Sequence, residues 1–201
     1  MVGDYRSLAK ALNGAATVFA LQSPLLRGRP WHGDSFEALA ESYAARMLAV
    51  QPQGPHALLG WSFGGRLAVA VAQVLARRGM PAEFVGIVDT ATHWEEGAAS
   101  APDTPATPSA ETLDGSLLGA ALRTDAMHAA LMAAHALPRL DGELHVWRAA
   151  RNLGDPHRRM AWSRHAGSVR ERVLDATHAG IVHHPAWLQE LRSLFGADDS
   201  K

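Results

Sequence analysis

A serine flanked by glycines is the part of this sequence most suited to chemistry: the residues G-W-S-F-G at 60–64 fit the pattern G-x-S-x-G. An apolar run at 56–61 precedes Ser62, and a helical pattern at 63–79 follows it. A serine at such a strand–helix junction forms a nucleophile elbow, whose strained backbone raises the hydroxyl above the sheet. The first N–H groups of the helix then face the oxygen that becomes negative during acyl transfer, and Phe63 N–H is the expected donor.

A serine hydroxyl is a weak nucleophile and needs a histidine base that is oriented by an acid. The sequence offers 11 histidines. Sites of parallel-sheet proteins lie beyond the carboxyl ends of the strands, which favours His178, two residues after the strand expected to end at Ala176. His93 also follows a strand but precedes a Pro-rich segment, and His183 and His184 are expected to lie on the surface beside the last helix.

Two aspartates compete for the role of the acid. Asp89 closes the apolar strand expected at 83–88, and Asp155 follows the strand expected at 143–149. Position in the sequence leaves both open, because each lies at the carboxyl end of an expected strand. Asp155 in Gly-Asp-Pro also suits a turn, and Asp89 also suits a helix N-cap.

Composition excludes several classes of protein. A chain of 201 residues, 47% hydrophobic, is expected to form one domain over 1–201 that buries about 70% of its unfolded surface. The balance of 19 basic and 20 acidic residues lacks the positive footprint of a nucleic-acid binder. With Cys 0, disulfides, thiolate metal sites and a cysteine nucleophile are absent.

Three further expectations concern metals, membranes and location. The spacing of His178, His183 and His184 lacks an accompanying carboxylate pattern, so neither a metal nor a bound cofactor is expected. No apolar run is long enough to cross a membrane, and the first residues lack the apolar region of a signal peptide. The sequence therefore predicts a cytoplasmic protein with no nucleic-acid or membrane partner.

Strand-like and helical segments alternate along the chain, which predicts an α/β fold with a mostly parallel sheet covered by helices on both faces. Ser35 is the expected N-cap of a helix. A small, polar segment with three prolines at 97–112 predicts a mobile insertion at about 91–125. The expected helices are 4–13, 36–50, 63–79, 126–137, 156–166 and 185–195, and the expected strands are 17–21, 56–61, 83–88, 143–149 and 169–176.

The stretch 21–79, with G-W-S-F-G-G at its elbow, closely resembles the thioesterase domains that end nonribosomal peptide synthetase and polyketide synthase assembly lines. The resemblance continues through Val-Asp-Thr at 88–90 and into the His178 loop. It implies an α/β-hydrolase fold with Ser62 as nucleophile, His178 as base and Asp89 as the orienting acid. It also implies a substrate chain carried on the phosphopantetheine thiol of an acyl or peptidyl carrier protein domain. The serine takes up this chain, and water or an internal nucleophile then releases it as an acid or a ring.

The sequence departs from this family in two places. Members begin with a strand and a His-Pro-x-Gly-Gly-like loop that supplies the second oxyanion donor, whereas this chain opens on a segment like the helix after that loop. The missing strand would be central, so unpaired edges are expected at 17–21 and 56–61, closed by direct pairing, an upstream segment or a homodimer partner. The segment between Asp89 and Pro138 is short for the family's lid, which predicts a reduced lid and an open site.

A second function is consistent with the same residues. A degenerate thioesterase-like protein could serve as a non-catalytic binding or scaffold partner in a biosynthetic assembly. The missing oxyanion segment favours this alternative, and the complete set of Ser62, Asp89 and His178 favours the enzyme.

Overall fold

A parallel sheet of four strands forms the centre of the computed structural model, which describes residues 2–23, 35–94, 117–153, 158–159 and 161–196. Its strands are β1 (Ala57–Trp61), β2 (Phe84–Val88), β4 (Glu143–Ala149) and β6 (Ser168–Leu174), in the order β1-β2-β4-β6. All three neighbouring pairs are parallel. The structure thereby confirms the predicted α/β class.

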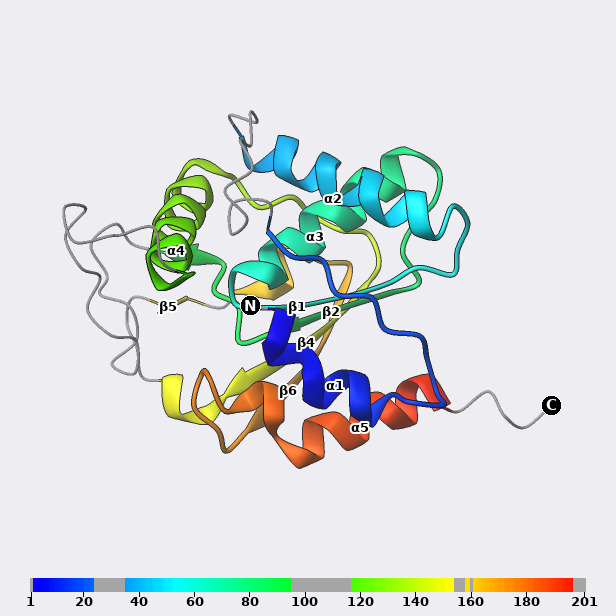
Figure 1. Ribbon diagram of the computed structural model, residues 1–201, viewed down its shortest axis with the longest axis vertical. Coiled ribbons are helices and arrows are strands. Elements are labelled where there is room, and N and C mark those ends of the chain that lie inside the picture. Colours follow the sequence, from blue (N-terminus) through cyan, green and yellow to red (C-terminus); the bar gives the residue numbers. More distant parts are fainter. Residues whose placement is uncertain (1, 24–34, 95–116, 154–157, 160, 197–201) are drawn as a thin grey trace.

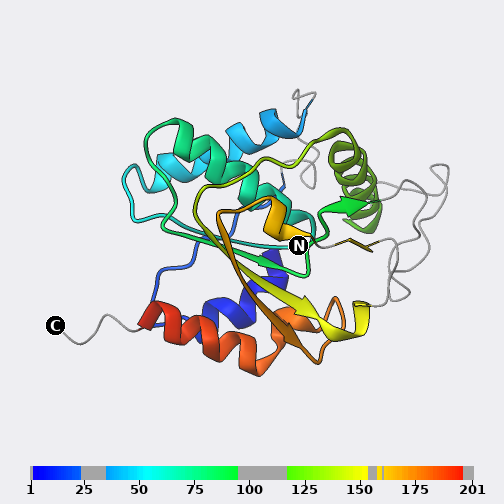
Figure 2. The same ribbon diagram turned by 180° about the vertical axis from the view of Figure 1, so that it is seen from behind.

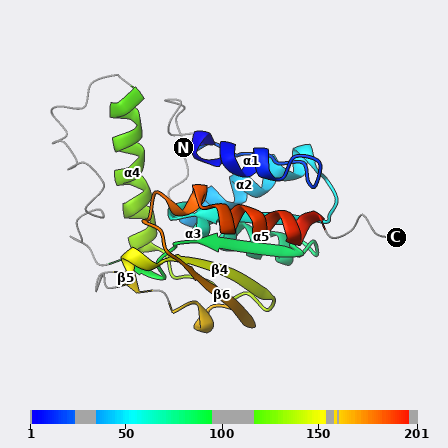
Figure 3. The ribbon, with the colours of Figure 1, turned by 90° about the horizontal axis from the view of Figure 1, so that it is seen from below.

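Helices cover both faces of the sheet (Figures 1 and 2). One face is covered by α1 (Arg6–Ala11) and α5 (Pro185–Gly196), and the other by α2 (Phe36–Val50) and α3 (Phe63–Arg77). A fifth helix, α4 (Leu117–Ala134), stands at the end of the sheet where the parallel strands finish (Figure 3). Among the described residues, no helix combines the length and the apolar character that crossing a bilayer requires.

Alternate residues of the strands enter two separate cores, because successive side chains of a strand point to opposite faces. Val85 and Ile87 of β2 pack with α3 on one side, while Val88 packs with Trp187 and Leu191 of α5 on the other. Strands buried on both faces are near-continuous apolar runs, which is why β2 could be located from the sequence.

Two helix ends follow from local residue chemistry. The hydroxyl oxygen of Ser35 accepts a hydrogen bond from Ala38 N–H at 3.1 Å, which confirms Ser35 as the N-cap of α2. Helix α3 ends in a Schellman motif: Gly79 has a φ of 75°, and Met80 N–H donates to Leu75 C=O at 3.0 Å. Local sequence therefore sets where α2 begins and where α3 ends.

The expected strand at 17–21 is wrong. Residues 16–23 form no strand, and the side chain of Phe19 is 61% exposed. A β-strand is stabilised by pairing with a neighbour, and β1 pairs with β2 alone among the described strands. At its outer edge, Trp61 N–H donates instead to the hydroxyl of Tyr5 at 3.0 Å. That an upstream segment or a homodimer partner covers this edge stays a prediction.

The expected helix at 156–166 is also wrong. Its described residues form a short strand, β5 (Arg158–Arg159), and a 3-10 turn at Trp162–Arg164. Strand β5 is antiparallel to β3 (His93–Trp94), and the buried Trp162 donates from Nε1 to Thr90 C=O at 2.7 Å. These two contacts hold the segment across the end of the sheet in a path that a helix could not follow.

The helix expected at 126–137 begins earlier, at Leu117 of α4. Most of the insertion expected at about 91–125 falls on residues 95–116, outside the described residues. Asp155, the second candidate acid, lies outside them as well.

Candidate active site

Ser62 lies at the junction of β1 and α3, where the sequence pattern places the elbow. Its backbone has φ 56° and ψ −123°, a conformation that a residue with a side chain adopts only at an energetic cost. Ser62 N–H donates to Val88 C=O at 2.9 Å, and Ser62 C=O accepts from Gly65 N–H at 3.0 Å. These bonds hold the strained residue between the end of the sheet and the first turn of the helix.

Two glycines make this tight turn sterically possible. A Cβ atom on Gly60 would lie 1.9 Å from the carbonyl oxygen of Gly64, and a Cβ atom on Gly65 would lie 2.0 Å from Oγ1 of Thr90. Neither position can carry a side chain unless the backbone or a packed neighbour moves. The glycines of the motif are therefore required by the close approach of β1, α3 and the segment after β2.

Asp89 follows β2 directly and is fully buried, with 0% exposure. Its φ of 45° is, with that of Ser62, one of the two positive values among described residues other than glycine. One carboxylate oxygen accepts from Ala149 N–H at 3.1 Å, and the other accepts from the side-chain amide of Asn152 at 2.9 Å. Two donors from the end of β4 thus fix the carboxylate of a residue at the end of β2.

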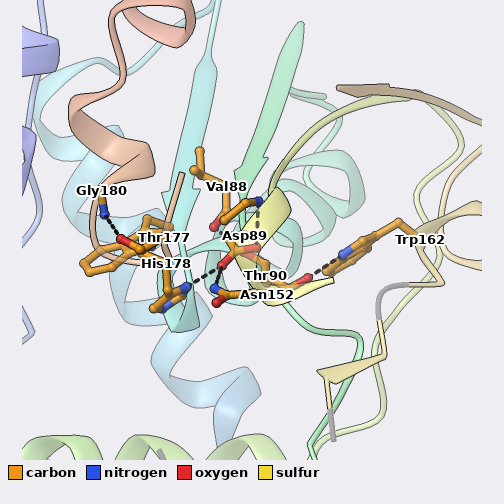
Figure 4. A network of polar contacts seen from close by, with 10 residues as sticks. Val88, Asp89, Thr90, Asn152, Trp162, Thr177, His178 and Gly180 are labelled. Atoms are coloured by element: carbon orange, nitrogen blue, oxygen red, sulfur yellow. Dashed lines mark hydrogen bonds and ion pairs between the residues drawn. The ribbon is translucent and has the colours of Figure 1, made fainter. Parts of the chain in front are cut away.

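His178 contacts this carboxylate (Figure 4). Its Nδ1 lies 2.6 Å from Oδ2 of Asp89. A carboxylate accepts hydrogen bonds, so Nδ1 carries the proton and the basic lone pair of the imidazole lies on Nε2. Thr177 Oγ1 accepts from Gly180 N–H at 3.1 Å and shapes the turn that presents the ring.

The loop of His178 also contacts the strand that leads to Ser62. Trp61 Nε1 donates to His178 C=O at 3.0 Å, and the centres of the two rings are 4.9 Å apart. The structure thus brings Asp89 and His178 into direct contact and holds His178 against the residue before Ser62. The catalytic roles expected from the sequence for Ser62, Asp89 and His178 stay predictions.

Other sequence candidates lie elsewhere. His183 is exposed and contacts the hydroxyl of Ser7 at 3.0 Å, and His93 lies in β3. Asn152 was not foreseen. The only signal for it was its position just after β4, at the same end of the sheet as the other polar groups.

Helix α4 reaches the elbow through a ring contact. His128 of α4 stacks on Phe63, with ring centres 3.8 Å apart and an interplanar angle of 8°. His128 Nε2 also contacts the hydroxyl of Ser23 at 3.2 Å. Burial lowers the pKa of His128 to about 4, so the imidazole is neutral at pH 7. The residue after Ser62 is therefore covered by an uncharged ring from α4.

Acid is expected to destabilise this contact. The pKa of His128 is lower in the folded protein than the ordinary 6.5, so the unfolded chain binds the proton more tightly. The contribution is fully present above about pH 6.5 and is lost between about pH 6.5 and pH 4, by up to about 3 kcal/mol. Urea unfolding at several pH values should therefore show a smaller loss of stability in His128→Gln than in the wild type. Equal losses in both proteins would contradict this assignment.

Comparison with known proteins identifies the family. A model described as a thioesterase domain matches residues 1–184. The chain belongs to the thioesterase domain family. Enterobactin synthase component F of Escherichia coli O157:H7 is 32% identical over 104 residues, which are 50% of this chain and 8% of that protein. A protein named inactive atromentin synthetase invA6, from Paxillus involutus, is 38% identical over 89 residues, 44% of this chain and 9% of that protein. This thioesterase domain thus spans less than a tenth of the length of either synthetase.

Solved structures agree with this assignment. The NocB thioesterase domain from the nocardicin cluster is 18% identical, with a TM-score of 0.76, and the match covers 96% of this chain and 87% of that one. At this identity it supports the fold alone. The RedJ thioesterase from the prodiginine biosynthetic pathway of Streptomyces coelicolor is 25% identical, with a TM-score of 0.69 over 98% of this chain and 85% of that one. The resemblance to assembly-line thioesterase domains is confirmed, and with it the α/β-hydrolase fold.

Proposed function

We propose that this thioesterase domain is a serine enzyme that releases a peptidyl or polyketide acyl chain from the phosphopantetheine of a carrier protein domain. The contact of 2.6 Å between His178 Nδ1 and Asp89 Oδ2 carries the proposal, because it leaves the ring with a basic Nε2. The strained backbone of Ser62 supports it, since strain at a polar residue is typical of a reactive site.

Each residue then has one role in acyl transfer. Ser62 Oγ attacks the thioester carbonyl while His178 Nε2 takes the hydroxyl proton, and Phe63 N–H donates to the oxyanion. The carbon–sulfur bond breaks, the leaving thiol takes the proton from His178, and the acyl group remains on Ser62 as an ester. Asp89 stays ionised and stabilises the imidazolium in both steps.

The second half of the reaction releases the chain. Water, or a hydroxyl or amine of the chain itself, attacks the acyl ester and gives its proton to His178. The ester bond breaks and Ser62 Oγ recovers that proton, which leaves an acid or a ring as product. The phosphopantetheine arrives and leaves with the carrier, so no bound cofactor is required of this chain, and we place the reaction in the cytoplasm.

Thiol release tests this proposal. The purified protein should hydrolyse acyl or peptidyl N-acetylcysteamine thioesters, which present the terminal atoms of phosphopantetheine. One thiol should be released for each thioester molecule that is cleaved. Ser62→Ala should reduce the rate to that of the buffer. A folded wild-type protein that releases no thiol from any of a panel of acyl chains would contradict the proposal.

Asn152 provides a weaker effect on the same reaction. Its amide holds Asp89 Oδ2 at 2.9 Å, so Asn152→Ala should let the carboxylate turn and lower kcat by about tenfold to a hundredfold with little change in KM. Arg151→Ala is the matched control, because the neighbouring side chain bonds the exposed Asp175 at 3.3 Å. Steady-state kinetics should compare kcat and KM of the two variants with those of the wild type. An Asn152→Ala enzyme as active as Arg151→Ala would remove Asn152 from the site.

A non-catalytic role is the second candidate function. Among described strands, β1 pairs with β2 alone, and one relative carries the name of an inactive synthetase. An edge of β1 that carries no second described strand suits a protein that binds an assembly component without turning it over. Folded protein that binds an acyl carrier domain but releases no thiol would favour this role.

A further inference from the structure

Arg66 is a buried cation that the proposed reaction does not use. It lies in the first turn of α3, four residues after Ser62, and only 3% of the residue is exposed. Burial lowers the pKa of its guanidinium to about 10, which still leaves the group charged at pH 7. An arginine buried to this extent needs compensating partners.

Backbone carbonyl groups are its partners. Nη2 of Arg66 donates to Met132 C=O at 3.1 Å and to His135 C=O at 2.9 Å, and Nη1 lies 3.5 Å from Thr92 C=O. Met132 belongs to the last turn of α4, and His135 follows the helix. The last carbonyl groups of a helix lack partners within it and carry partial negative charge. Arg66 therefore caps the carboxyl end of α4 from the first turn of α3.

A second contact holds the same end of α4 to α2. His135 Nδ1 lies 2.6 Å from a carboxylate oxygen of Glu37, and its ring stacks on Phe36 with centres 4.4 Å apart. Phe36 in turn meets the ring of Phe63 edge-on at 5.5 Å. The carboxyl end of α4 is thus joined to the elbow by both polar and aromatic contacts.

Helix α4 is well placed to limit the space beside the nucleophile. It stands where the parallel strands end (Figure 3), and its His128 covers Phe63, the residue next to Ser62. An acyl chain bonded to Ser62 Oγ would therefore begin at the residue next to Phe63, the residue that His128 covers.

We propose that Arg66 is a positioning residue that fixes α4 against the elbow and thereby sets which length of acyl chain the site accepts. We call the hydrogen bonds from Arg66 to the carboxyl end of α4 the tether. The effect on acyl-chain length rests on the proposed thioesterase function, whereas the tether does not. Arg66→Met removes the charge and all three hydrogen bonds and leaves an unbranched apolar side chain. These bonds end on carbonyl groups of Thr92, Met132 and His135, so their loss should loosen this end of the protein and leave the cores on the two faces of the sheet intact. The variant should therefore fold and release α4.

Two measurements test the tether and its consequence. Hydrogen exchange of backbone amides should rise about tenfold or more in α4 of Arg66→Met, and stay unchanged in β2 and β4. The ratio of kcat/KM for octanoyl to that for acetyl N-acetylcysteamine thioester should change at least about fivefold, mainly through KM for the longer chain. Arg66→Lys, which keeps the charge and fewer donors, should restore both quantities in part.

Arg77→Met is the matched control. Arg77 lies on the same helix, but its side chain is 54% exposed and pairs with Glu41 at the surface. The control should match the wild type in both measurements. Unchanged exchange in α4 of Arg66→Met would overturn the tether even in an inactive protein. Increased exchange with an unchanged ratio of the two thioesters would overturn the role in chain length. Wild-type protein that cleaves neither thioester would contradict the proposed function and leave the exchange result to decide the tether.

Discussion

Asp89→Asn is expected to lower kcat for thioester hydrolysis by about four orders of magnitude. The carboxylate of Asp89 accepts from His178 Nδ1 at 2.6 Å, and it also accepts from Ala149 N–H and Asn152. An asparagine amide that donates to the ring would favour the tautomer with its proton on Nε2, which cannot accept the serine proton. The imidazolium formed during the reaction would also lose its counter-charge.

The fold should tolerate this change, which separates chemistry from stability. Asparagine has nearly the same shape and keeps one acceptor oxygen, so the free energy of unfolding should fall by no more than about 2 kcal/mol. Steady-state kinetics and urea unfolding of the same preparation make the comparison. Asp175→Asn is the control, because this exposed aspartate pairs with the exposed Arg151. A loss of activity below about tenfold in Asp89→Asn would show that His178 does not depend on Asp89.

Gly60→Ala is expected to have the largest effect on the structure itself. The added Cβ atom would lie 1.9 Å from the carbonyl oxygen of Gly64, which is backbone and cannot rotate away. Strand β1 and helix α3 would have to separate at the elbow, at a cost of about 3 kcal/mol or more in the free energy of unfolding. Ser62 lies between Gly60 and Gly64, so activity should fall with stability.

Gly142→Ala is the matched control for this prediction. A Cβ atom on Gly142 meets nothing within 4 Å, so the change in stability should stay within about 1 kcal/mol. Thermal unfolding of both variants gives the comparison. If Gly60→Ala were as stable and as active as Gly142→Ala, the close contact at the elbow would not be a requirement of the fold.

The elbow and the buried strands could be predicted because their signals are local. Ser62 lies between glycines at a strand–helix junction, and β2 is an apolar run that is covered on both faces. Asp89 and His178 each follow a strand of one parallel sheet, so their meeting at one edge follows from topology. The resemblance to thioesterase domains selected Asp89 over Asp155, which position alone had left open.

Contacts between distant segments account for most of what the sequence did not reveal. Whether residues 17–21 form a strand depends on a neighbouring strand, and Tyr5 occupies the edge of β1 that could have paired. The path at 158–164 depends on the burial of Trp162 against Thr90, which residue periodicity does not encode. The burial of Arg66 could not be predicted, because its partners are backbone carbonyl groups, which every residue carries.

Covalent labelling tests whether the hydroxyl of Ser62 is an activated nucleophile. A fluorophosphonate reacts with a serine only when a base has activated its hydroxyl. We expect one adduct per wild-type chain, located on Ser62 by peptide mass spectrometry. The adduct should be absent from Ser62→Ala and should form at least about a hundredfold more slowly in His178→Ala and Asp89→Asn. Folded wild-type protein that forms no adduct, or forms it on another residue, would contradict the account.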